Sequence, residues 1–148
     1  MIMPLKRTEH WATREYHEFL LQRVHIPFKW GENDCCLFPA DAIKAFTGTD
    51  IAADFRGKYN DQPTALAAIR NIAGGSTVAD AAAWAAKKHG LAELEHPLMA
   101  QRGDLVVLQD SGNIIAGIVH LNGRHVIAVG ERGLKRFSIS SIQRAWRV

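Results

Sequence analysis

The sequence predicts an α+β fold, in which helices fill the first two thirds of one domain and an antiparallel sheet fills the last third. Up to about residue 96, apolar side chains recur at the three- and four-residue steps of amphipathic helices. After Pro97 the pattern changes to short runs of β-branched residues with turn sequences between them. A chain of 148 residues without an internal repeat is expected to form a single domain, residues 1–148.

Residues 1–27 are predicted to contain one amphipathic helix and the approach to the next segment. The helix is expected over residues 8–24, where apolar side chains recur at helical spacing. Thr8 is a suitable residue to cap its first turn.

Residues 28–96 are predicted to hold three further helices, each of which ends at a glycine signal. The expected ranges are 37–46 with Gly48 as the C-cap, 63–73 ending at Gly74-Gly75, and 78–89 ending at Gly90. Thr77 and Asp80 have nearly the arrangement of a capping box at the start of the last helix.

Residues 97–148 are predicted to form the antiparallel sheet. Four segments have strand character: "DLVVLQ", "NIIAGIVHL", "RHVIAVG" and "GLKRFSIS". Asn122-Gly123 separates the second from the third and predicts a type I′ hairpin, because both central residues of that turn need a positive φ.

Composition excludes several classes of function. The net charge of +3 comes from scattered basic residues, without the basic stripe and interleaved aromatics that nucleic acid binding favours. No apolar run approaches the roughly 20 residues that cross a bilayer, so we expect no membrane span. The start of the chain lacks the apolar core of a secretory signal, and we therefore expect synthesis in the cytoplasm.

Cys35 and Cys36 are adjacent, and three roles compete for them: a nucleophile, a metal-ligand pair, or two small side chains in a core. Adjacent cysteines close almost no loop, so a disulfide between them cannot staple a fold. The chain has neither Cys-x-x-Cys spacing nor a His-x-x-x-His pair, and we expect no metal and no other cofactor. Free thiols agree with a reducing compartment.

Cys35 occupies a position that suits a nucleophile. It follows the turn-forming residues of "GEND" and leads into the helix expected over 37–46, where the helix dipole favours a thiolate. Pro39 lacks an N–H, so regular hydrogen bonding cannot begin much before Cys36. Cys35 is therefore expected at the cap or in the first turn, and Cys36 is expected to be a small buried side chain.

These residues resemble the motifs of the NlpC-type cell-wall peptidases, papain-like enzymes that cut peptidoglycan stem peptides. Asp34-Cys35 matches the family's nucleophile motif, and residues 103–106 match its Gly-Asp-Leu-Val strand. Gly117-Ile118 and residues 121–123 match the next strand and turn. The resemblance runs from about Phe28 to the end of the chain and implies a papain-like fold.

The chain departs from this family at the residues that perform catalysis. The family's catalytic histidine falls on Ile115 and its second polar residue on Ile127, and an isoleucine can neither take up nor return a proton. His125 shares strand parity with Ile127 and is the remaining candidate partner for Cys35. Asp34 and Trp30 are predicted to line the site.

The combination of "WGENDCCLFPADAI", "FRGKY", "RGDLVVL" and "AWRV" also resembles small proteins encoded in phage tail gene clusters. This resemblance implies a virion component of the tail tip or baseplate hub with a degenerate peptidase fold. Its partners would be other tail-tip proteins, it would be oligomeric around the tail axis, and it would pass from the host cytoplasm into the virion. The alternative is an active cysteine peptidase or amidase that cuts peptidoglycan during phage entry.

Aromatic residues are the candidates for a partner surface in the structural hypothesis. These candidates are Trp11, Phe28, Trp30 and Trp146. The loop "FRGKY" is either a second contact, because Arg and Tyr favour interfaces, or a solvated loop.

Overall fold

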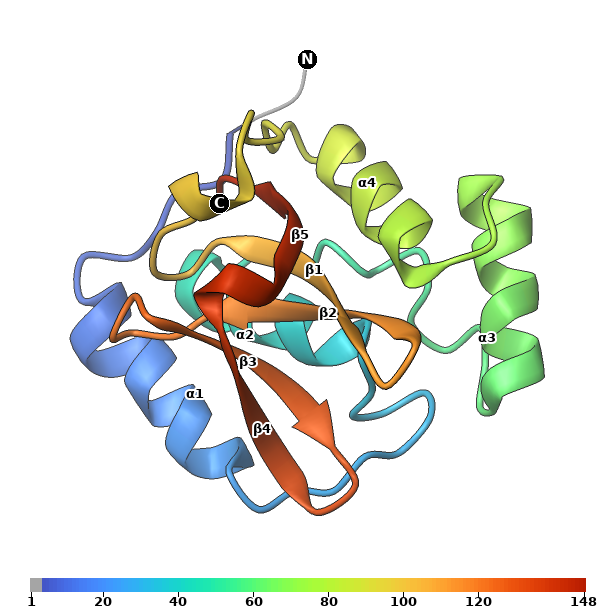
Figure 1. Cartoon of the computed structure of the whole chain (residues 1–148), viewed down its shortest axis with the longest axis horizontal. Helices are drawn as coiled ribbons and strands as arrows, with labels where there is room; N and C mark the ends of the chain where they lie inside the picture. The colour runs from blue at the N-terminus through green and yellow to red at the C-terminus, as the bar shows by residue number, and fades with distance from the viewer. Residues whose placement is uncertain (1–3) are drawn as a thin grey trace.

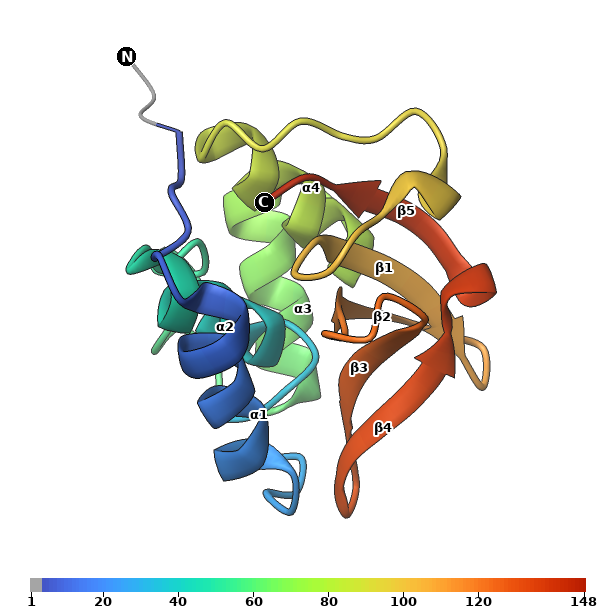
Figure 2. The same ribbon diagram turned by 90° about the vertical axis from the view of Figure 1, so that its left-hand side faces the viewer.

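Helices cover one face of a five-stranded antiparallel sheet in the computed structural model, which describes residues 4–148 (Figures 1 and 2). The predicted α+β class is thereby confirmed. The helices are α1 (Tyr16–Arg23), α2 (Leu37–Thr47), α3 (Gln62–Ala68) and α4 (Val78–Lys88). The strands are β1 (Leu105–Asp110), β2 (Asn113–Val119), β3 (His125–Gly130), β4 (Gly133–Ser138) and β5 (Ile142–Trp146).

The N-terminal helix begins later than the sequence predicted. A π-helical turn, η1 (Trp11–Glu15), precedes α1, and the Thr8 side chain does not cap it. The Thr8 hydroxyl donates instead to the Glu15 carboxylate at 3.0 Å, and the Thr8 N–H donates to the Phe46 carbonyl at 2.8 Å. Thr8 thus ties the extended N-terminal segment to the end of α2.

The predicted ends of the later helices are confirmed. Gly48 closes α2 in the left-handed conformation, and Gly74 does the same after η2 (Ile69–Ala73), a π-helical turn that continues α3. Thr77 and Asp80 form the expected capping box at the start of α4. A second capping box, formed by Asp61 and Thr64 at the start of α3, was not predicted.

The sheet has the strand order β4-β3-β2-β1-β5. The predicted four-strand meander is confirmed, whereas β5, which pairs with β1, was not predicted. The type I′ prediction for Asn122-Gly123 is wrong, because five residues separate β2 from β3 and Asn122 has a negative φ. Ser111 and Gly112, both with positive φ, form the two-residue turn between β1 and β2 instead.

The sheet is strongly rolled, because its two edge strands are consecutive in the chain. Only η4 (Ile139–Ser141) joins β4 to β5, and the four steps from Ser138 to Ile142 reach at most about 14 Å. The edges of a flat five-stranded sheet would lie about 19 Å apart. The roll encloses a small apolar cluster on the face of the sheet that points away from the helices, which we call the outer face. The cluster consists of Ala100, Val106, Leu108, Val119, Val126, Ile142 and Ala145.

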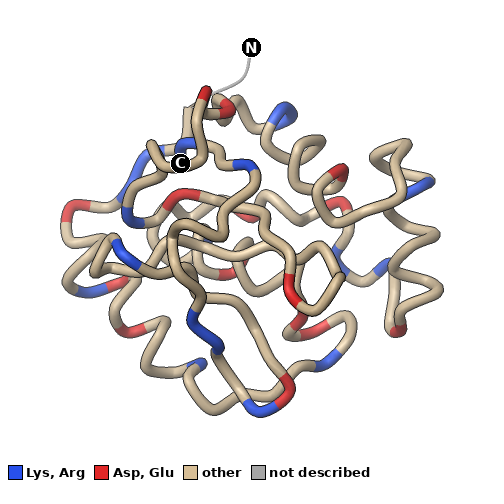
Figure 3. Tube along the Cα trace, in the orientation of Figure 1, with Lys and Arg blue, Asp and Glu red and all other residues tan. Residues whose placement is uncertain are grey.

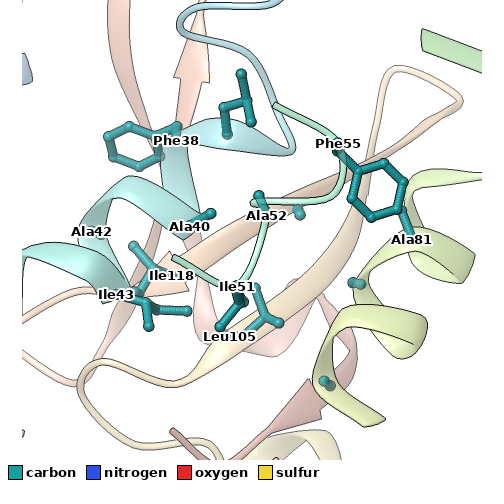
Figure 4. Close-up of a cluster of buried hydrophobic side chains, with 14 of the residues drawn as sticks. Phe38, Ala40, Ala42, Ile43, Ile51, Ala52, Phe55, Ala81, Leu105 and Ile118 are labelled. Carbon is teal, nitrogen blue, oxygen red and sulfur yellow. The ribbon is translucent and has the colours of Figure 1, made fainter. Parts of the chain in front are cut away.

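The main core lies between the sheet and the helices. The helix α2 is its centre, because Leu37, Ile43 and Phe46 are fully buried. Figure 4 shows Ile43 of α2 beside Ile118 of β2. Figure 4 also shows Ile51, Phe55 and residues of α4 around α2. This packing fixes the start of α2, and therefore the position of Cys35, relative to the sheet.

Asp104 joins both ends of the chain to the sheet. Its carboxylate is fully buried and accepts hydrogen bonds from the Arg147 guanidinium at 2.9 Å and from the Val148 N–H at 3.0 Å. The Arg7 guanidinium approaches the same carboxylate at 3.4 Å, and the Gln101 N–H donates to it at 2.8 Å.

Charged residues of both signs alternate over the trace of the chain (Figure 3). Among the described residues, no helix combines the length and the apolar character that would be needed to cross a bilayer.

Asp104→Ala is expected to lower the free energy of unfolding by about 3 kcal/mol, because it removes a fully buried carboxylate that accepts hydrogen bonds from Arg147 and from the Gln101 and Val148 N–H groups. Chemical denaturation of the purified variant measures this loss. The control is Glu93→Gln, which removes an exposed partner of Arg144 and should cost less than about 1 kcal/mol. Equal effects of the two substitutions would contradict the role given to Asp104.

Candidate functional site

A tight turn before α2 positions the two cysteines. Gly31 has a φ of +80°, and a Cβ at this position would lie 2.5 Å from the Tyr59 carbonyl oxygen. Only glycine therefore allows the turn to lie this close to the loop that holds Tyr59. Asn33 is buried and donates through its amide to the Ile26 and Pro27 carbonyls.

Asp34 organises this turn from the inside. Its Oδ1 accepts the N–H groups of Cys36 and Leu37 at 3.0 and 2.9 Å, and thereby caps the start of α2. Its Oδ2 accepts the Gly31 N–H at 2.8 Å and the Tyr59 hydroxyl at 2.7 Å. Asp34 is fully buried and does not line the groove described below, so the structure gives it a positioning role.

Cys35 lies at the mouth of a groove next to the N-terminus of α2. The groove has a volume of about 460 Å³, and Cys35 lines it although only 7% of the residue is exposed. Trp30 and Phe28 form one wall, with their rings edge to face and the ring centres 4.9 Å apart. The other lining residues include Leu66, Ile69, Ile114, Ile115 and Val129.

Cys36 lines the same groove, and it is half-buried whereas Cys35 is buried, so the prediction of a buried Cys36 is wrong. The hydrogen bond with Cys35 and burial raise the pKa of the Cys36 thiol, and the negative charge of Asp34 acts in the same direction. The Cys36 thiol is therefore neutral over the physiological range of pH. Cys36 also borders a small apolar cavity of about 30 Å³ between α2 and α4.

No histidine is found among the described residues that line the groove. His125 lies half-buried at the start of β3, and its Nδ1 is 2.9 Å from the Asn122 side-chain nitrogen. Nδ1 of the neighbouring His120 accepts the Asn122 N–H at 3.0 Å. Burial lowers the pKa of His120, and nearby Arg136 and His125 add to this effect.

Isoleucines stand at the groove where a catalytic base would be needed. Ile115 lies on the outer face of β2, whereas its neighbour Ile114 is on the face that packs toward the helices. Both border the groove, but the sequence analysis singled out only Ile115, as the position of the family's catalytic histidine. Ile127, the second family position, is buried in the main core.

A second hollow continues the groove. It has a volume of about 830 Å³ and extends over the turn between β3 and β4. The two hollows share the lining residues Phe28, Asp110, Asn113, Ile115 and Val129. We call the two together the trough.

The "FRGKY" loop is a structural element that sequence reasoning did not recognise. Arg56 forms ion pairs with Asp41 of α2 at 2.7 Å and with Asp50 at 2.8 Å. Arg23 binds the same Asp41 at 2.7 Å, and Tyr59 of the loop binds Asp34 as described above. The loop therefore holds α2 in place, which is neither of the two roles considered for it.

The aromatic candidates for a partner surface lie in different environments. Sequence alone left the core and interface roles of Trp146 open; the residue is only 2% exposed and belongs to the main core, so it is not a surface contact. Trp11 is half-buried beneath the Arg7 guanidinium, which lies 4.1 Å from its ring centre. Trp30 and Phe28 line the trough.

Comparison with known proteins gives one match. The profile of a family described as "Domain of unknown function (DUF6950)" matches residues 6–148, which is nearly the whole chain. No curated protein and no solved structure matches the chain.

Asp34→Ala is expected to lower the free energy of unfolding by on the order of 3 kcal/mol, because the cap of α2 and the Tyr59 contact are lost together. Tyr59→Phe removes one hydrogen bond to the carboxylate and should cost about 1.5 kcal/mol. Urea denaturation followed by tryptophan fluorescence measures both. If Asp34→Ala proved no more harmful than Tyr59→Phe, the capping role would be refuted.

Proposed function

The chain belongs to the DUF6950 family, and we propose that it is a component of the distal phage tail whose NlpC-like groove binds a partner without cutting it. In this proposal it acts in tail assembly or genome delivery, beside other tail-tip or hub proteins arranged around the tail axis. It is made in the host cytoplasm and leaves in the virion.

One observation carries the non-catalytic part of this proposal: Cys35 lines a groove bordered by Ile114 and Ile115 and by no histidine among the described residues. A cysteine nucleophile needs a base that takes its proton and later protonates the leaving amine. An isoleucine side chain has no group that binds a proton. In this proposal the groove retains a thiol but has no side chain that can carry out the proton transfers of hydrolysis.

The resemblance to the NlpC-type peptidases is supported by the structural roles of the shared motifs. The Asp-Cys motif stands at the start of a helix that packs on the sheet, with Asp34 as the cap. The Gly-Asp-Leu-Val motif begins β1, with Asp104 holding the chain ends. The placement in a phage tail rests on the sequence resemblance to tail-cluster proteins.

The tail placement predicts that purified virions of the phage that encodes this chain contain it in a fixed number of copies. Quantitative mass spectrometry of gradient-purified particles measures this number. Deletion of the gene should yield particles with defective tail tips in electron micrographs, and a Cys35→Ser copy should restore them. Infectious, normal particles without the protein would refute the placement.

An active peptidoglycan hydrolase remains the second candidate, because Cys35 lies at the N-terminus of α2 in an aromatic-walled groove. That arrangement is typical of thiol nucleophiles. His125 would have to leave its contact with Asn122 and reach the Cys35 sulfur for this chemistry to proceed.

The two candidates predict different behaviour toward cell-wall fragments. We expect the wild-type protein to release no more product from purified muropeptides than Cys35→Ala does, as measured by mass spectrometry. Cleavage that disappears in both Cys35→Ala and His125→Ala would establish the hydrolase instead.

A further inference from the structure

The sheet is split between β2 and β3. These strands pair only at Ile118–Ile127 and Val119–Val126, after which they diverge. The first five residues of β2, from Asn113 to Gly117, pair with β1 alone. Figure 1 shows the consequence, since the β1–β2 hairpin and the β3–β4 hairpin point in different directions.

The split leaves backbone groups of β2 without a neighbouring strand. Val119 exchanges hydrogen bonds with the Gly103–Asp104 segment before β1, whereas the His120 N–H donates toward β3, to the His125 carbonyl. Backbone groups of a strand alternate in direction, so those of Ile114 and Ala116 face away from β1. The N–H and C=O of Ile114 therefore point into the gap that β3 leaves.

The trough occupies this gap. Asn113, Ile114 and Ile115 line it from β2, and Val129 lines it from β3. At the end of β3 the Phe28 N–H donates to the Gly130 carbonyl at 3.1 Å, which holds the aromatic wall against this strand. The edge of β2 at Ile114 borders the same groove as Cys35 and this wall.

We propose that an extended segment of a neighbouring protein in the tail adds as a strand to β2 in the trough, with its backbone paired to Ile114. This inference deepens the proposed function and rests on it, because a strand can stay in the trough only if Cys35 does not cleave it. Strand addition of this kind gives affinity through backbone hydrogen bonds, and pockets for alternate side chains give selectivity.

The charges of the trough favour a protein segment over a peptidoglycan stem peptide. Asp110 is the only charged residue among the described residues that line the groove beside Cys35, and Lys135 already neutralises it at 2.9 Å. A stem peptide carries several carboxylates, which find no counter-charge in the groove beside Cys35, because Arg132 and Lys135 line only the second hollow. Its D-residues also do not fit an L-strand ladder. An uncharged L-peptide with apolar side chains at alternate positions fits both the backbone edge and the apolar walls.

Nuclear magnetic resonance with the ¹⁵N-labelled full chain tests this inference. The probe is an acetylated and amidated hexapeptide of alternating threonine and valine, titrated to about 1 mM, a concentration at which even weak pairing is seen. We expect the Ile114 amide to exchange rapidly with solvent in the free protein and to shift and become protected when the peptide binds. The Ile115 amide, which faces β1, should be protected throughout.

Two controls separate strand pairing from general apolar binding. A peptide methylated on alternate backbone nitrogens should bind about tenfold more weakly, since it cannot complete the ladder. Ile114→Pro removes an N–H that faces the trough and leaves the N–H groups that pair with β1 in place. It should weaken binding by a similar factor, whereas Ile114→Val should not. A peptide that shifts no trough amide, or equal binding of the methylated peptide, would overturn the inference even if Ile114→Pro failed to fold.

A further arm uses a synthetic stem tetrapeptide under the same conditions. Tighter binding of the stem peptide than of the hexapeptide would overturn the choice of a protein segment. If strand addition fails, the measured number of copies per virion still tests the tail placement independently. If the protein binds the hexapeptide but is absent from virions, only the tail placement is refuted.

Discussion

The short connection between β4 and β5 is the constraint from which the architecture follows. Three residues of η4 must join the two edges of a five-stranded sheet, so the sheet rolls until these edges approach each other. The ladder of this rolled sheet is shortest between β2 and β3, which pair at only two positions. The trough opens at that same place, and α2 brings Cys35 to its rim. The rolled sheet and the split beside Cys35 together give the surface that we propose as the binding site.

Two buried carboxylates show how motif residues can persist for structural reasons. Asp34 accepts hydrogen bonds from backbone groups and from Tyr59, and Asp104 accepts them from both chain ends. Removing either carboxylate would lower the free energy of unfolding even if it has no catalytic role, because a buried donor without its acceptor is strongly unfavourable. These structural roles explain why Asp34 and Asp104 would be retained in the degenerate peptidase fold that we propose.

Sequence reasoning predicted the elements whose signals are local, and it failed where tertiary contacts decide. The glycine ends of α2 and η2 and the capping box of α4 depend on residues a few positions apart. The strand β5 was missed because Gln143 and Arg144 interrupt its apolar pattern, and only pairing with β1 makes it a strand. In the site, the position of Cys35 before α2 followed from Asp34 and Pro39. The roles of Tyr59 and Ile114 depend on distant segments that no local pattern reveals.

The meeting of both chain ends at Asp104 has a topological consequence. Arg7 and Val148 reach the same carboxylate, so the two ends of the described chain lie close together. A short linker could join the ends covalently, and the backbone could then be opened at another surface loop without changing the sheet order. Circularly permuted forms of this protein should therefore fold, with Asp104 still buried beside the joined original ends. Other proteins could then be fused to the new ends.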